Sequence, residues 1–207
     1  ILPKAVLPRG QSLRGLMNVE EQRRYEKGLA AFKLPAGGLD RFEPWYAAIS
    51  LASLPLMRAG YASENGVENM LEVRAKALGR ERIGLETPDY QLGLFDSLPA
   101  AVQKRYLLDV VDTLPDMAGE LGAIIAAWKT GQAERLAQLM NEQEDDPEVM
   151  RVLLFQRNKA WADWVKARLA QPGQVFVAGG ALFARGLVAG AGIRANSSRD
   201  STSRRTV

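Results

Sequence analysis

The chain has 207 residues, of which 47% are hydrophobic and 25% are charged, a balance typical of a globular domain. It contains no histidine and no cysteine, which excludes serine–histidine hydrolysis, cysteine nucleophiles and disulfide frameworks in this chain. The 27 Lys and Arg residues are interspersed with 24 Asp and Glu, so the net charge is only +3 and no nucleic-acid-binding surface is predicted. No apolar run approaches the roughly 18 residues that a membrane span requires.

Helix signals dominate the first 80 residues. Asn18 stands three residues before Glu21, a spacing that predicts a capped helix with Tyr25 on its inward face. A second helix is expected over residues 41–58, and a third from Gly66 to a stop at Gly79.

Two short segments predict β-strands. Residues 82–86 are apolar at their centre, so we expect a buried strand that ends at Glu86. Thr87 should cap a helix whose first residue is Pro88. Residues 174–178 are β-branched and aromatic and predict a second strand. The expected fold class is therefore α+β, predominantly helical with a small β-sheet (strands near 82–86 and 174–178).

The remaining elements are predicted to be helical. One helix should run from residue 98 to 131, bent near Pro115, and the last long helix should begin at Asp146-Pro147 and end near Leu169. The tryptophans fall on apolar helix faces and are expected in the core. We expect a single domain over residues 1–195, followed by a disordered Ser/Arg tail at 196–207.

Two acidic residues are candidates for chemistry. At the end of its predicted strand, Glu86 would sit where open sheets place their sites, as a base or a metal ligand. It could equally accept hydrogen bonds from the first amides of the following helix. Glu68 lies in the first turn of its predicted helix, where compensation of the helix dipole is sufficient to explain it.

Arg157 and Asn158 form a polar pair in the middle of the last predicted helix, near its apolar face. Such a pair needs partners. One interpretation is a buried ion pair of Arg157 with Glu86 or Asp163. The other is a clamp for an anionic substrate, because the guanidinium presents a planar fork of donors.

Several different short motifs are distributed along the chain from about Leu7 to Ala178. They are Gln11–Leu16, Pro44-Trp45, Ala59–Tyr61, Gly66–Glu68, Gly84–Thr87, Gln91-Leu92 with Phe95, Trp128 with Gly131, Arg157-Asn158 with Trp161, and Val175–Ala178. In order and spacing, these segments resemble the TraB/GumN family, which also includes the TIKI proteins. The resemblance covers most of the chain, although each motif alone is weak.

The family's most characteristic elements are two Gly-x-x-His motifs, one on the first strand and one after the last conserved strand. We expect the first to fall before Ile1, and residues 179–183 occupy the position of the second without a histidine. That departure leads to the hypothesis of a frameshift, a degenerate reading or an altered terminus. The resemblance implies an α+β domain similar to metal-dependent peptidases, in which a divalent metal activates water. Export signals in bacterial relatives imply a periplasmic or secreted location.

The resemblance assigns roles to the candidate residues. It implies that Glu86 is a metal ligand or base, that Glu68 is a second catalytic acid, and that Arg157 and Asn158 bind substrate. The leading interpretation is a TraB/GumN-like protein similar to metal-dependent hydrolases, inactive as written because both histidine motifs are missing. It would hold no cofactor as written, whereas intact relatives would hold a divalent metal. The alternative is a non-catalytic binding or scaffold domain that takes a peptide or small molecule in a helical cleft.

Overall fold

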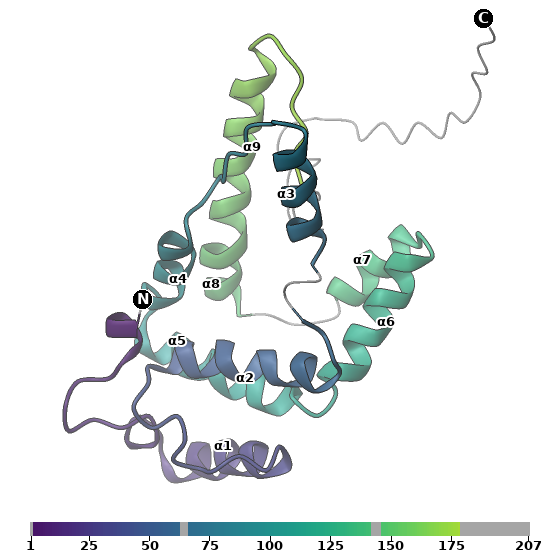
Figure 1. Cartoon of the computed structure of the whole chain (residues 1–207). Helices are drawn as coiled ribbons and strands as arrows, with labels where there is room; N and C mark the ends of the chain where they lie inside the picture. The colour runs from purple at the N-terminus through teal and green to yellow at the C-terminus, as the bar shows by residue number, and fades with distance from the viewer. Residues whose placement is uncertain (1, 63–65, 142–145, 179–207) are drawn as a thin grey trace, which may run out of the picture. The chain divides into compact units, whose positions relative to one another are not determined.

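A computed structural model describes residues 2–62, 66–141 and 146–178. Backbone contacts divide the chain into two compact units, Ile1–Leu153 and Leu154–Val207. The described residues are helical, and an isolated antiparallel bridge joins Val6 to Phe42 (Figure 1). They contain no β-sheet, so the prediction of an α+β fold was wrong.

Neither predicted strand forms. Residues 82–86 are irregular and bend at Leu85 and Glu86, and the Ile83 side chain is 62% exposed. Residues 174–178 are also irregular, with Phe176 79% exposed. A β-branched or aromatic residue favours a strand when a hydrogen-bonded partner and a surface to cover are present. Among the described residues, neither segment has such a partner. The position predicted for the second histidine motif and the predicted tail lie outside the described residues.

The first unit begins with two 3-10 turns, η1 (Leu2–Ala5) and η2 (Arg14–Leu16), followed by α1 (Val19–Ala31). The predicted cap of α1 is confirmed: the side chain of Asn18 accepts from the Glu21 backbone N–H, and the Glu21 carboxylate accepts from the Asn18 N–H. The guanidinium of Arg14 donates to both carboxylate oxygens of Asp40 at 3.0 and 2.6 Å. This bidentate pair ties the N-terminal segment to the loop that precedes α2.

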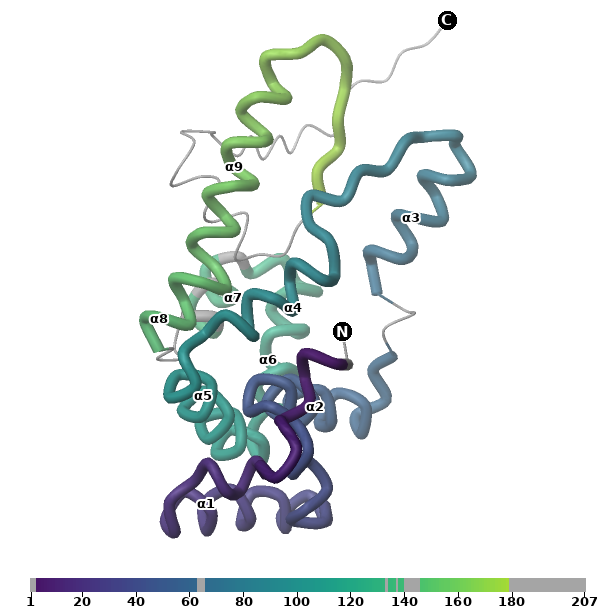
Figure 2. The backbone as a smooth tube through the Cα atoms, turned by 90° about the vertical axis from the view of Figure 1, so that its left-hand side faces the viewer, coloured from purple at the N-terminus to yellow at the C-terminus, as the bar shows by residue number. Residues whose placement is uncertain are grey.

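The core of the first unit lies between α1, α2 (Pro44–Arg58) and α5 (Ala100–Thr113). α2 and α5 lie side by side, with α1 below them (Figure 1 and Figure 2). The predicted inward face of α1 is confirmed by the complete burial of Tyr25. The buried cluster comprises Leu7, Leu13, Met17, Tyr25, Leu29, Ala47, Ala48, Leu51, Leu107, Leu108, Val110, Val111 and Leu114.

The remaining helices of this unit largely follow the sequence signals. α3 (Val67–Ala77) ends before Gly79, whose φ of +61° explains why a glycine stands there. α4 (Pro88–Asp96) begins at the predicted proline. The single bent helix expected over 98–131 is instead two helices, α5 and α6 (Met117–Lys129), separated around Pro115. α6 packs against α7 (Ala133–Asn141).

The last predicted helix is confirmed at both ends. Asp146 caps α8 (Pro147–Met150) by accepting from the Glu148 N–H at 2.9 Å. α8 continues through a π-helical segment, η4 (Arg151–Phe155), into α9 (Gln156–Leu169). Val149 and Val152 of this stretch join Leu98 and Val102 in a second, smaller apolar cluster of the first unit. α9 belongs to the second unit.

Candidate functional site

Glu86 is positioned by the start of α4 and not by a strand. The Thr87 hydroxyl accepts from the Tyr90 N–H at 3.2 Å, which caps the helix as predicted. The carboxylate of Glu86 is half-buried and accepts from the side-chain amide of Gln91 at 3.0 Å. Glu86 is therefore fixed by a side-chain amide one turn into α4, while Thr87 satisfies the first turn of the helix.

Glu68 lies in the first turn of α3, and its side chain is exposed. This placement fits the expected compensation of the helix dipole. α3 contributes no buried residue. Across the described residues, no group of three or more Asp, Glu, His or Cys side chains is arranged to hold a metal ion. Among the described residues, neither Glu68 nor Glu86 therefore belongs to a cluster with enough ligands for a metal site.

Arg157 and Asn158 lie on α9, in the second unit. The guanidinium carbon of Arg157 lies 5.3 Å from the ring centroid of Trp161, one turn along the helix, a cation–π geometry. Asn158 is 8% exposed. Asp163, one of the two acids considered as a partner for Arg157, forms an ion pair with Lys159 at 3.0 Å. The guanidinium of Arg157 stacks on an aromatic ring of its own helix.

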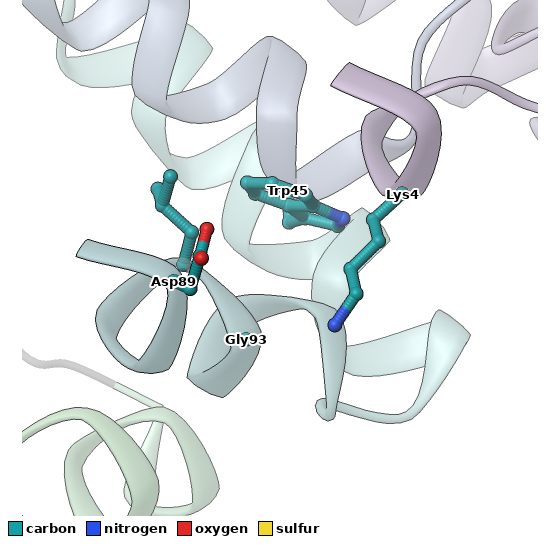
Figure 3. A pocket seen from close by; sticks show the side chains of 5 residues that line it. Lys4, Trp45, Asp89 and Gly93 are labelled. Carbon is teal, nitrogen blue, oxygen red and sulfur yellow. The ribbon is translucent and has the colours of Figure 1, made fainter. Parts of the chain in front are cut away.

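A cavity of about 240 Å³ lies elsewhere in the first unit. Lys4 of η1, Trp45 of α2, and Asp89, Leu92 and Gly93 of α4 line it (Figure 3). The indole nitrogen of Trp45 lies on the side of the ring nearer Lys4, and Asp89 lies on the other side (Figure 3). The cavity thus brings together a cation, an acid and an aromatic N–H from three separate elements.

Local hydrogen bonds explain why η1 and α2 meet at this cavity. The backbone N–H of Glu43 donates to the Ala5 carbonyl at 2.8 Å, and the Leu7 N–H donates to the Arg41 carbonyl at 2.9 Å. These bonds hold the segment after Lys4 against the start of α2. Pro44 occupies the first turn of that helix, where its missing N–H costs no hydrogen bond. Trp45 follows directly and is only 1% exposed.

The prediction that the tryptophans lie in the core is confirmed for Trp45, whose ring stacks on Phe95 with centroids 6.3 Å apart and meets Tyr46 edge-on at 5.7 Å. It is wrong for Trp128, whose side chain is 60% exposed.

Sequence reasoning did not identify the cavity. The Trp45 indole N–H is buried and has no hydrogen-bond partner. The Tyr25 hydroxyl and the side-chain oxygen of Gln103 are likewise buried without a hydrogen-bond partner, so the Trp45 N–H does not by itself indicate a ligand.

Two acidic residues near the start of α2, Glu43 and Asp40, have shifted pKa values. Burial raises the pKa of the half-buried Glu43 carboxyl above its usual value, and the nearby Asp96 raises it further. On the other side of the N-terminal segment, the hydrogen bond from Arg14 lowers the pKa of Asp40. The unit therefore contains one carboxylate held in its charged form and another whose ionisation is resisted.

The first unit is helical where it is described and has a small cavity of mixed charge, and the described residues of both units contain no metal-ligating cluster. The model of the TraB/PrgY/gumN family matches residues 1–187, so the chain belongs to this family. The resemblance read from the short motifs is thereby confirmed. No curated protein and no solved structure showed a significant match. Within the described residues, every helix is too short or too polar to cross a bilayer.

Proposed function

We propose that the described part of this TraB/PrgY/gumN-family chain is a binding domain for a small polar ligand. The observation that carries the proposal is the cavity beside Trp45, where Lys4 of η1 and Asp89 of α4 line one small space. Lys4 can donate to an acceptor group of a ligand, and Asp89 can accept from a donor group. Small-molecule sites have this composition: mostly apolar walls with a few polar groups that fix orientation.

A second candidate function is metal-dependent hydrolysis, which the family resemblance supports. In that proposal Glu86 is a ligand or base, Glu68 a second acid, and Arg157 and Asn158 hold the substrate. A divalent metal would supply a polarised water for amide cleavage. The donor set of the described residues does not fit such a metal, because histidine and cysteine are absent from the sequence and the acids form no cluster. No catalytic step is therefore assigned to these residues.

Metal titration separates the two functions. We expect the purified chain to bind neither zinc, manganese nor cobalt stoichiometrically in isothermal titration calorimetry, and Glu86→Gln to leave that result unchanged. The matched control is Glu81→Gln, on an exposed acid of the same irregular segment. Stoichiometric metal binding that Glu86→Gln abolishes and Glu81→Gln preserves would overturn the proposal in favour of the hydrolase.

A further inference from the structure

Residues 174–178, which follow α9 in the second unit, form an exposed apolar segment. Val175, Phe176 and Val177 follow one another, and all three side chains are exposed. Apolar residues scattered singly over a surface are ordinary, whereas three adjacent large ones form a patch. Covering them removes apolar area from water, which is favourable. The segment therefore has a surface that a partner would cover.

The backbone of this segment is unpaired as well. Residues 174–178 are irregular, and in the part of the chain that the structure describes no hydrogen bond involves their backbone N–H and C=O groups. Unpaired backbone groups beside apolar side chains are a template on which another strand can pair. The side chains and the backbone thus indicate the same kind of partner, which is a β-strand.

The composition of the segment does not oppose such pairing. Proteins commonly protect exposed strand edges with charged residues or proline. Residues 174–178 contain neither. The other β-prone segment of the chain, residues 82–86, differs in this respect: Arg82 and Glu86 stand at its ends, and Arg82 forms an ion pair with Glu72 at 3.1 Å. Of the two, the segment after α9 is therefore the one without protection against strand pairing.

The order of the residues is self-complementary, because Val175-Phe176-Val177 reads the same in both directions. In an antiparallel pair of two copies with the two-fold axis at Phe176, the two phenylalanines face each other and each Val175 faces a Val177. Successive side chains of a strand point to opposite faces, so the valines share one face and the phenylalanines the other. Aromatic and β-branched cross-strand pairs stabilise antiparallel strands. The segment thus fits a second copy of itself.

We propose that residues 174–178 are an interaction segment that pairs with the same segment of a second copy of this chain. The two segments form an antiparallel β-ribbon centred on Phe176. The inference is independent of the cavity beside Trp45, which lies in the first unit. A two-stranded ribbon of this length is short, so the association is weak and depends on chain concentration.

Charges at the two-fold axis test the pairing. Sedimentation velocity of the full chain at up to about 100 μM should show a dimer whose fraction rises with concentration. Phe176→Lys and Phe176→Glu each place like charges opposite each other and should weaken dimerisation about tenfold. An equimolar mixture of the two variants should dimerise again, because opposite charges then face each other. The matched control is Phe155→Lys, on another exposed aromatic residue of the same unit that lies in the helical segment η4.

Disulfide cross-linking tests the register. The chain has no cysteine, so a single introduced thiol can pair only with the same thiol of another copy. Residues directly opposite each other in an antiparallel pair have Cα atoms about 4.5–5.5 Å apart, a distance that a disulfide bridges. Under mild oxidation by copper phenanthroline, Phe176→Cys should form a covalent dimer quickly, whereas Phe155→Cys should not.

Because Phe176 is exposed, each variant should keep the helical circular dichroism of the parent chain. A parent chain that stays monomeric at about 100 μM would overturn the proposal. So would a dimer that Phe176→Lys leaves unchanged, or cross-linking of Phe155→Cys at the same rate as Phe176→Cys.

Discussion

The contact between α1 and α5 depends on the absence of a side chain at Gly28. A Cβ placed there would overlap the Cγ1 of Val111 and approach the Val111 carbonyl oxygen to 3.2 Å. Val111 is β-branched and 1% exposed, so its methyl has little freedom to rotate away, and the carbonyl oxygen belongs to the backbone of α5 and can yield only by moving that helix. Gly28→Ala should therefore push the two helices apart.

The magnitude follows from two opposing effects. Replacing glycine by alanine inside a helix is favourable by about 1 kcal/mol, because the backbone loses less entropy on folding. Overpacking a core contact costs about 1–3 kcal/mol, and the overlap with the Val111 Cγ1 beside the tight backbone contact places this site in the upper part of that range. The expected net effect is a loss of about 1–2 kcal/mol in the free energy of unfolding.

Urea unfolding followed by circular dichroism measures this difference, with Gly119→Ala as the matched control. An added Cβ at Gly119 meets no atom within 4 Å, so that variant should gain about 0.5–1 kcal/mol. Combining Gly28→Ala with Val111→Ala should recover part of the loss, because the first clash is removed. If Gly28→Ala stabilises the protein as much as Gly119→Ala does, the helix packing described here is wrong.

Three further predictions concern stability. The hydrogen bond from Arg14 lowers the pKa of Asp40 from its ordinary value of 3.8. This pair therefore stabilises the fold at pH values above 3.8, and its contribution is lost as the pH falls through the folded-state pKa. Asp40→Asn should flatten the acid limb of a plot of melting temperature against pH. Burial and the nearby Asp96 raise the pKa of Glu43 above 4.5. The contribution of the protonated Glu43 to stability is therefore fully present below pH 4.5 and is lost as the pH rises through the folded-state pKa. Glu43→Gln should raise the melting temperature at neutral pH and not at about pH 4, and an equal rise at both pH values would argue against burial of the charged carboxylate as the cause. Thr87→Ala removes the cap of α4 and should cost about 1 kcal/mol in urea unfolding, whereas a loss within error would mean that the cap bond is replaced by water.

Helix termini could be predicted from the sequence because their causes are local. The capping box of Asn18, the Thr87-Pro88 start and the Asp146-Pro147 start each depend on residues within one turn of one another. The break near Pro115 was recognised but underestimated, since a proline signal does not say whether a helix bends or ends.

The predicted strands failed because a strand depends on distant partners. Ile83 and Phe176 have the residue types of buried strands, yet both side chains are exposed in irregular segments. A high β-propensity means that a side chain packs well on the surface of a sheet, and the described residues form no sheet on which these side chains could pack. The cavity could not be predicted for a related reason. The cavity exists only where η1, α2 and α4 meet, and these elements are far apart in the sequence.

The most direct test of the account observes the Trp45 N–H itself. In a nitrogen–proton correlation spectrum, the four tryptophans give four indole signals, and Trp45→Phe identifies the one that belongs to Trp45. On titration with acetate and with butylamine, which probe the Lys4 and Asp89 sides of the cavity, we expect the Trp45 signal to shift saturably with at least one of them, while the signals of the other three tryptophans stay in place. A Trp45 signal that does not move at millimolar acetate or butylamine would contradict the assignment of this cavity as the binding site.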